Sequence, residues 1–273
     1  MRSVVSGLFT VVAMICMIVA VPSMWLSQRV VSSDGFTSSA AEAAHSSEVQ
    51  DYFAQKVAAS VEENTGSKVA SDLVLPAAKN YARSDGFVED FSEVARQQHS
   101  WLFTAPAPDA DLHMMELDIS PMINRVIASA PIPVPVSIGH PVIVTIDQSQ
   151  ITAGSLEDSG KIIDVVSWVT VIGAVIAAVI ALLVANRRST VLAWLGVGAV
   201  LAGVAGWGLA AFTKHIVSER LADTEQAARS TIEVVVGVIA DHLTTVSLFV
   251  GVAGAVVAVV GVISRVAAGR RYA

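Results

Sequence analysis

The sequence predicts a mainly α-helical membrane protein, with four transmembrane helices and an extracytoplasmic α-helical domain that carries a small two-stranded β element. Hydrophobic residues make up 53% of the 273 residues and charged residues only 15%, a composition typical of membrane proteins. Between Val165 and Phe212 lie two apolar spans without an ionisable residue. Each is close to the ~20 residues that a helix needs to cross the hydrocarbon layer. The two spans are joined by residues 185–190, which include Arg187 and Arg188.

The charge distribution predicts the orientation of the chain. Positive residues close to membrane spans stay on the cytoplasmic side, so Arg187 and Arg188 are the topology residues that place the tip of this hairpin in the cytoplasm. Two further spans, Val4–Leu26 and Leu243–Ile263, give four spans with both termini cytoplasmic. The charged residues of the predicted cytoplasmic parts are then all basic, and all 24 Asp and Glu lie on the outer side. We therefore expect a multi-pass protein of the plasma membrane.

The predicted spans divide the chain into six parts. These are an N-terminal transmembrane anchor (1–26), an extracytoplasmic domain (27–160), a transmembrane hairpin (161–212), an extracytoplasmic helical connector (213–242), a fourth span (243–264) and a cytoplasmic tail (265–273). The first span is longer than the apolar core of a signal peptide, so we expect it to be retained. The one cysteine, Cys16, lies inside this span and is interpreted as a buried apolar residue.

Three segments of the extracytoplasmic domain show apolar residues at helical spacing. The first covers Val49–Val61 and ends at Gly66, the second covers Lys68–Arg83, and the third runs from Phe87 to Leu102. Because one face of each pattern is apolar, these faces are expected to be buried together.

After Thr104 the long helical patterns end, and strands and a short helix are predicted. Met115–Ile119 and Val142–Ile146 are predicted strands that are expected to pair. Between them, Ser120 as a helix cap and Pro121 at the first helical position predict a short helix.

The connector 213–242 contains no proline and carries an amphipathic pattern. Its apolar stripe, which includes Ile232 and Val235, could rest on the lipid interface or on the extracytoplasmic domain. The domain is favoured, because helices that lie on anionic lipid carry more Lys and Arg. Ser230 and Glu233 fit a capping box, which predicts that the last long helix starts there and that a short helix precedes it.

No familiar catalytic, phosphate-binding or dinucleotide-binding motif occurs in the sequence, so we expect neither an enzyme nor a cofactor. His113 and Glu116 have the spacing of a helical metal site, but on a strand they would point to opposite faces. Asp109, Asp111, Glu116 and Asp118 lack the arrangement of an EF-hand loop, so a solvated acidic surface is preferred to a calcium site. The acidic exterior also disfavours nucleic acid as a partner, because phosphates require Lys and Arg.

Pumping and secondary transport are disfavoured, because the spans contain no Asp, Glu, His, Lys or Arg with which to bind or relay a charge. The spans instead carry small residues at four-residue steps, which let helices approach closely. Two interpretations stay open: these residues pack the four spans against one another, or they dock on helices of another subunit. They are Gly173, Ala177, Ala181, Gly198, Ala202, Gly206, Gly254 and Ala258.

The order of these features resembles a family. The chain resembles the four-span integral membrane proteins common in actinobacteria, most of which have no assigned function. The resemblance lies in a single anchor, an outer helical domain that opens with Asp34 and Phe36, the segment 117–121, the strand that ends at 144–147 and the tip at Arg187 and Arg188. Size and layout also resemble small accessory subunits of the actinobacterial cytochrome bcc-aa3 oxidase supercomplex. The resemblance carries over no haem or copper ligand set.

The expected function is a non-catalytic accessory or scaffolding subunit of a plasma-membrane complex, with the respiratory bcc-aa3 supercomplex as the first choice. Its partners would be other membrane subunits, such as those of cytochrome bcc or the aa3 oxidase, and membrane lipids. The alternative is an envelope-facing binding module for a lipid or cell-wall component, which predicts a closed apolar pocket within Val49 to Phe103. A hydrolase would require Ser, His and Asp side chains that converge only in space.

Overall fold

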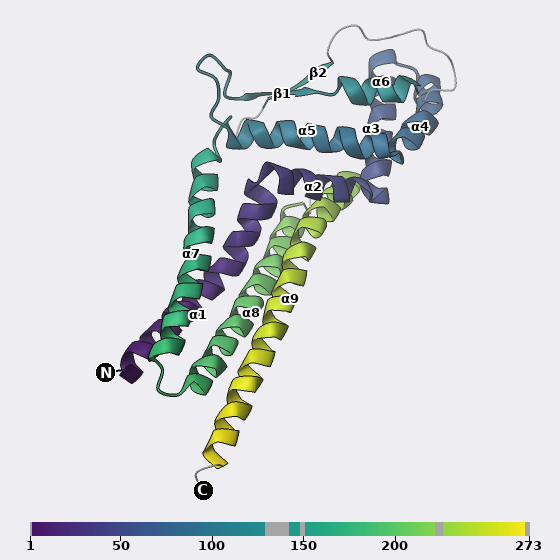
Figure 1. The fold of residues 1–273 in the computed structure, drawn as a ribbon. Coiled ribbons are helices and arrows are strands. Elements are labelled where there is room, and N and C mark those ends of the chain that lie inside the picture. The colour runs from purple at the N-terminus through teal and green to yellow at the C-terminus, as the bar shows by residue number, and fades with distance from the viewer. Residues whose placement is uncertain (1, 129–141, 148–150, 222–225, 271–273) are drawn as a thin grey trace. The chain divides into compact units, whose positions relative to one another are not determined.

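The computed structural model describes residues 2–128, 142–147, 151–221 and 226–270. The chain is mainly helical and divides into two compact units, each described here by itself (Figure 1). The span unit comprises Met1–Gln28, Lys161–Ile216 and Ile239–Ala273. The globular unit comprises Arg29–Gly160 and Val217–Val238.

Four helices among the described residues are long and apolar enough to cross a membrane, which confirms the predicted number of spans. They are α1 (Arg2–Leu26), α7 (Glu157–Val184), α8 (Arg188–Arg220) and α9 (Gln226–Arg270). A short π-helix, η1 (Ser27–Val31), continues α1. Their exposed surfaces are dominated by Val, Ile, Leu, Phe and Trp side chains, as expected of helices that face lipid.

Hydrogen bonds tie α1 to the hairpin of α7 and α8 at one end of the span unit. The Ser6 hydroxyl donates to the carbonyl oxygen of Ala181 at 3.0 Å, and the Asn186 amide donates to Ser3 Oγ at 3.4 Å. At the opposite end, the Ser27 hydroxyl donates to the Asp164 carboxylate. Polar side chains therefore connect the helices near both ends of the unit.

The start of α9 corrects the predicted capping box. The helix already begins at Gln226, and α8 extends to Arg220, so the expected start at Ser230 and the separate short helix are both wrong. The segment contains no proline to stop α8. Glu233 pairs instead with Arg229 one turn earlier, at 2.8 Å between Nε and Oε1.

The globular unit contains five shorter helices and one antiparallel strand pair among its described residues. They are α2 (Ser33–Ala44), α3 (Ser47–Thr65), α4 (Lys68–Ala82), α5 (Asp85–Phe103), α6 (Ser120–Ala128), β1 (Met114–Asp118) and β2 (Ile143–Asp147). Ser46 Oγ accepts a hydrogen bond from the Val49 amide at 3.2 Å and so caps α3. Gly66, with a φ of 66°, ends that helix in the left-handed region. The three helices predicted in this part of the chain are confirmed.

The two predicted strands pair, with Leu117 opposite Val144. Met115 and Leu117 point inward and their neighbours outward, which is the expected alternation. The predicted cap at Ser120 is wrong, because Ser120 is already the first residue of α6. The Asp118 carboxylate accepts the Ser120 amide at 2.9 Å, and Ser120 Oγ accepts the Val142 amide at 2.8 Å. Ser120 therefore joins α6 to the strand pair.

Aromatic side chains form the centre of the globular unit. Phe87 is fully buried, and its ring centroid lies 4.9 Å from Phe53, 5.7 Å from Tyr81 and 5.5 Å from Phe91. Val234 and Val235 of α9 pack on the edge of this core. The apolar stripe of the connector therefore rests on the globular unit, as the sequence predicted.

One buried polar network connects α4, α5 and α6 beside this core. The Tyr81 hydroxyl donates to Asp90 Oδ2 at 2.7 Å, and Arg125 Nε lies 3.3 Å from the same carboxylate oxygen. Asp90 is only 5% exposed, so these two partners compensate its charge. Burial, reinforced by the hydrogen bond to Asp90, raises the pKa of Tyr81 well above its usual range.

The Tyr81 pKa predicts a loss of stability at alkaline pH. In the unfolded chain Tyr81 ionises near pH ~10, whereas in the folded chain it stays protonated, so its contribution is complete below that pH and declines as the pH rises above it. In an ultraviolet titration of the folded chain, we expect the Tyr81 phenolate to appear only together with unfolding. The difference between wild type and Tyr81→Phe isolates its signal. A Tyr81 phenolate that forms near pH ~10 in the folded protein would contradict the network.

Candidate functional site

Four glycines bring α8 and α9 into backbone contact; we call them the glycine seam. A Cβ on Gly196 would fall on the amide nitrogen of Ala258, and a Cβ on Gly203 would lie 2.6 Å from the carbonyl oxygen of Ser247. Gly254 and Gly261 complete the seam on α9, where a Cβ would lie 2.7 Å and 2.5 Å from backbone nitrogens of α8. Such spacing leaves no room for a side chain.

The small residues predicted from the sequence lie mostly at contacts within the span unit. Ala177 and Ala181 are buried in a cluster with Ala13 of α1. Gly198 faces Met14, at 2.6 Å from an added Cβ to Met14 Cγ, and Gly206 faces Ser247. The remaining small residues also lie at contacts between the spans. Ala202 is fully buried, Gly254 belongs to the seam, Ala258 lies against Gly196, and a Cβ on Gly173 would lie 3.4 Å from Cys16 Sγ.

Three seam glycines, Gly196, Gly203 and Gly261, escaped the sequence prediction. That prediction followed small residues at four-residue steps, whereas the seam pairs each glycine with another seven residues away on the same helix. A seven-residue repeat is the spacing at which two helices keep the same faces together. The signal was therefore present in the sequence.

An open groove runs between α8 and α9 beside the seam. It encloses about 560 Å³ and is lined by Gly203, Val204, Trp207, Thr244, Leu248 and Gly251, among others. A Cβ on Gly251 would meet no atom within 4 Å, so α9 has open space on that side of Gly251. We call this feature the α8–α9 groove.

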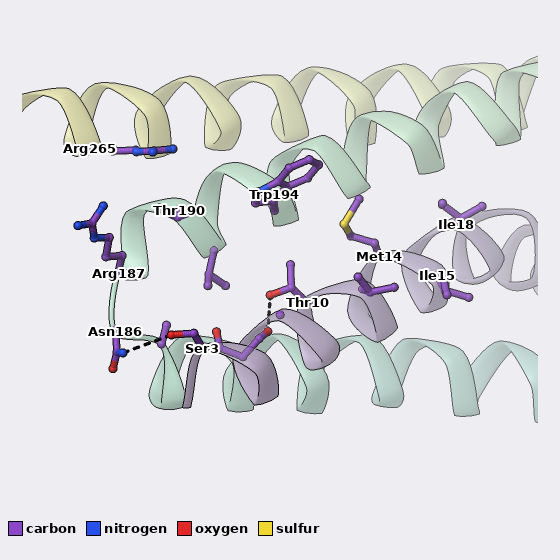
Figure 2. A pocket seen from close by; sticks show the side chains of 15 residues that line it. Ser3, Thr10, Met14, Ile15, Ile18, Asn186, Arg187, Thr190, Trp194 and Arg265 are labelled. Atoms are coloured by element: carbon purple, nitrogen blue, oxygen red, sulfur yellow. Dashed lines mark hydrogen bonds between the residues drawn. The ribbon is translucent and has the colours of Figure 1, made fainter. Parts of the chain in front are cut away.

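A larger cavity of about 740 Å³ lies at the end of the span unit where α7 and α8 are joined (Figure 2). Its walls come from α1, from the turn before α8, from α8 and from Arg265 of α9. Ser3, Asn186, Arg187 and Thr190 lie near Arg265 at one end. We call this feature the arginine cavity.

Apolar side chains line the rest of the arginine cavity. Met14, Ile15 and Ile18 follow one another along α1, and Trp194 faces them from α8 (Figure 2). None of the residues that line the cavity is acidic. The cavity is therefore positive at one end and apolar along its length.

The two predicted topology residues lie at the tip of the α7–α8 hairpin and are exposed. Arg187 lines the arginine cavity, whereas Arg188 opens α8 and does not line it. Arg265 and Asn186 were not recognised as site residues in the sequence. Arg187 and Arg265 are far apart in the sequence, and they line the same cavity because α9 packs beside α8.

The acidic residues of the globular unit border a shallow hollow of about 510 Å³. Asp109, Asp111 and Glu116 line it together with Trp101. Asp111 accepts the His113 amide at 2.9 Å, and the hydrogen bond from Ser120 lowers the pKa of Asp118, so both carboxylates serve local turns. Within the described ranges, no three His, Cys, Asp or Glu side chains come together as metal ligands.

Comparisons of the chain with known protein families, with curated proteins and with solved structures find no match. What the structure establishes is a mainly helical protein with four candidate membrane spans and a small helical region that carries a two-stranded sheet.

Proposed function

We propose that this chain is a non-catalytic accessory or scaffolding subunit that docks laterally on a transmembrane helix of a larger plasma-membrane complex. The observation that supports the proposal is the α8–α9 groove, an open apolar channel in the surface of the span unit. The proposal includes the orientation inferred from the arginines, with the tip of the α7–α8 hairpin in the cytoplasm.

The floor of the groove favours a helix as its occupant. Gly203, Gly251 and Thr244 are small, and Gly251 has no atom within 4 Å of the place where its Cβ would be. In a membrane, helices associate through close van der Waals contact at small residues, because lipid tails are as apolar as leucine and supply no hydrophobic driving force. Trp207 and Leu248, which are 59% and 67% exposed, form apolar walls for such a helix.

The groove is also a part of α8 and α9 that internal packing leaves uncovered. The glycine seam is filled by the partner helix, and Gly198 is covered by Met14 and Met17 of α1. Gly251 has open space where its side chain would be. A further helix can therefore approach the backbone here without displacing one of the four spans.

The respiratory bcc-aa3 supercomplex is the complex that we propose first. This choice rests on the resemblance in size and layout to its small accessory subunits. The cytochrome bcc and aa3 oxidase subunits would then supply the helix that enters the groove.

The proposal predicts that filling the groove releases the chain from its complex. Gly251→Leu places a side chain in the groove from a position where a Cβ meets no atom within 4 Å. Gly208→Leu is the matched control, because Gly208 also has no atom within 4 Å of a Cβ but does not line the groove. After gentle detergent extraction from native membranes, we expect wild type and Gly208→Leu to co-purify with the same integral membrane subunits in a fixed ratio. Gly251→Leu should lose at least nine-tenths of them.

Two outcomes of this experiment would overturn the proposal. One is recovery of the wild-type chain as a free monomer, and the other is equal recovery of partners with both leucine variants. Mass spectrometry of the purified material identifies the subunits and so decides between the respiratory complex and another one.

The alternative function, an envelope-facing binding module, gains no support from the globular unit. In the region where it predicts a closed apolar pocket, the rings of Phe53, Tyr81, Phe87 and Phe91 contact one another in tilted and edge-to-face pairs. Val49 and Tyr81 are each only 2% exposed. These close contacts favour docking over ligand storage.

A further inference from the structure

The arginine cavity has the length of an extended lipid chain. On α1 its lining runs from Ser3 to Ile18. At the rise of an α-helix this corresponds to about 22 Å along the axis, more than half of a ~30 Å hydrocarbon layer. A small soluble anion would use only the polar end, whereas an acyl chain would use the apolar wall as well.

The polar end of the cavity has the chemistry of a phosphate site. Arg187 lies in the turn before α8 and Arg265 lies on α9, and both side chains are at the same end of the cavity (Figure 2). Their guanidinium groups donate in a fork that matches phosphate oxygens. Asn186, Ser3 and Thr190 add amide and hydroxyl donors. No carboxylate among the lining residues competes for the two arginines.

We infer that the arginine cavity binds one phospholipid with an anionic headgroup. The phosphate lies at Arg187 and Arg265, and one acyl chain lies along Met14, Ile15 and Ile18 against Trp194. Basic pockets between transmembrane helices on the cytoplasmic side hold such headgroups in the same way. A bound lipid would join α1 to α8 and α9, so it would act as a part of the span unit. The inference does not depend on the docking of a partner at the α8–α9 groove.

Native mass spectrometry of the full chain tests the site. The protein, released from detergent after incubation with equal amounts of phosphatidylglycerol and phosphatidylcholine, should carry one phosphatidylglycerol in preference. In the double variant Arg187→Gln with Arg265→Gln this preference should fall by about 25-fold, since each arginine near a headgroup of net negative charge contributes roughly fivefold. Arg188→Gln is the matched control: it removes a charge from the same turn but does not line the cavity.

A second variant distinguishes a lipid from a soluble anion. Gly7 lines the cavity one turn beyond Ser3, and a Cβ there would meet no atom within 4 Å, so Gly7→Leu narrows the channel and leaves both arginines in place. Gly7→Leu should lose the bound phosphatidylglycerol, and inorganic phosphate should fail to displace the lipid from wild type.

The site would be overturned by any of three results. Equal binding of both lipids by wild type would remove the headgroup specificity. Retention of phosphatidylglycerol by Gly7→Leu, together with displacement by inorganic phosphate, would identify a soluble anion as the ligand. The same loss in Arg188→Gln as in the double variant would show that total charge, rather than the cavity, attracts the lipid.

Discussion

Phe87→Ala is expected to lower the free energy of unfolding of the globular unit by about 3–5 kcal/mol, which is the usual cost of truncating a fully buried phenylalanine. The ring of Phe87 contacts those of Phe53, Tyr81 and Phe91, which come from three different helices. Its removal leaves a cavity at the point where α3, α4 and α5 meet. Hydrogen exchange of the full chain, followed by mass spectrometry on peptides of α4 and α5, measures this loss.

The control for Phe87→Ala lies on the neighbouring helix. Leu73 of α4 is 59% exposed, so Leu73→Ala should change the stability by less than about 0.5 kcal/mol. Peptides of α7 should exchange equally in all three proteins. A similar increase in exchange for both alanine variants would show that Phe87 is not at the centre of the core.

Gly196→Ala is expected to weaken the contact between α8 and α9 by about 1–3 kcal/mol. Its new methyl group would fall on the Ala258 amide nitrogen and lie 2.6 Å from the Gly254 carbonyl oxygen, so the two helices must separate. The higher helix propensity of alanine, worth about 0.5–1 kcal/mol, offsets only a part of this cost. Unfolding of the full chain by a denaturing detergent measures the change, with the fluorescence of Trp194 and Trp207 on α8 as the signal.

Gly251→Ala is the matched control for the seam. Gly251 lies on α9 as Gly254 does, but a Cβ there would meet no atom within 4 Å. We expect this variant to be as stable as wild type or slightly more stable, because only the helix propensity changes. Equal destabilisation by Gly196→Ala and Gly251→Ala would contradict the explanation that Gly196 stabilises the protein by allowing close approach of α8 and α9.

The sequence predicted the elements of the fold well because local patterns determine them. Four uncharged apolar stretches gave the four spans, and Gly66 gave the end of α3. The errors came where two local signals competed. Ser230 and Glu233 match a capping box, but nothing in the chain interrupts the helix before them, so α9 starts earlier. Ser120 is likewise a residue type that often caps helices, but its hydroxyl oxygen accepts the amide of Val142, the residue before β2.

The candidate sites were harder to predict, because they depend on how the spans pack. The small-residue stripes indicated close helix contacts, but the sequence could not say which faces meet. The arginine cavity combines Ser3, Arg187 and Arg265, which are far apart in the chain. In the sequence these arginines served only as markers of orientation. Their second property, a shared position at the end of an apolar channel, is visible only in three dimensions.

Site-specific photo-crosslinking in native membranes tests the docking of a partner helix most directly. A photoreactive residue is placed at Leu248, which lines the α8–α9 groove, or at Val175 of α7, which is similarly exposed but lies outside the groove. The account predicts that Leu248 forms an adduct with one transmembrane segment of another integral membrane subunit, whereas Val175 forms adducts with lipid only. Adducts with lipid alone at both positions would contradict it.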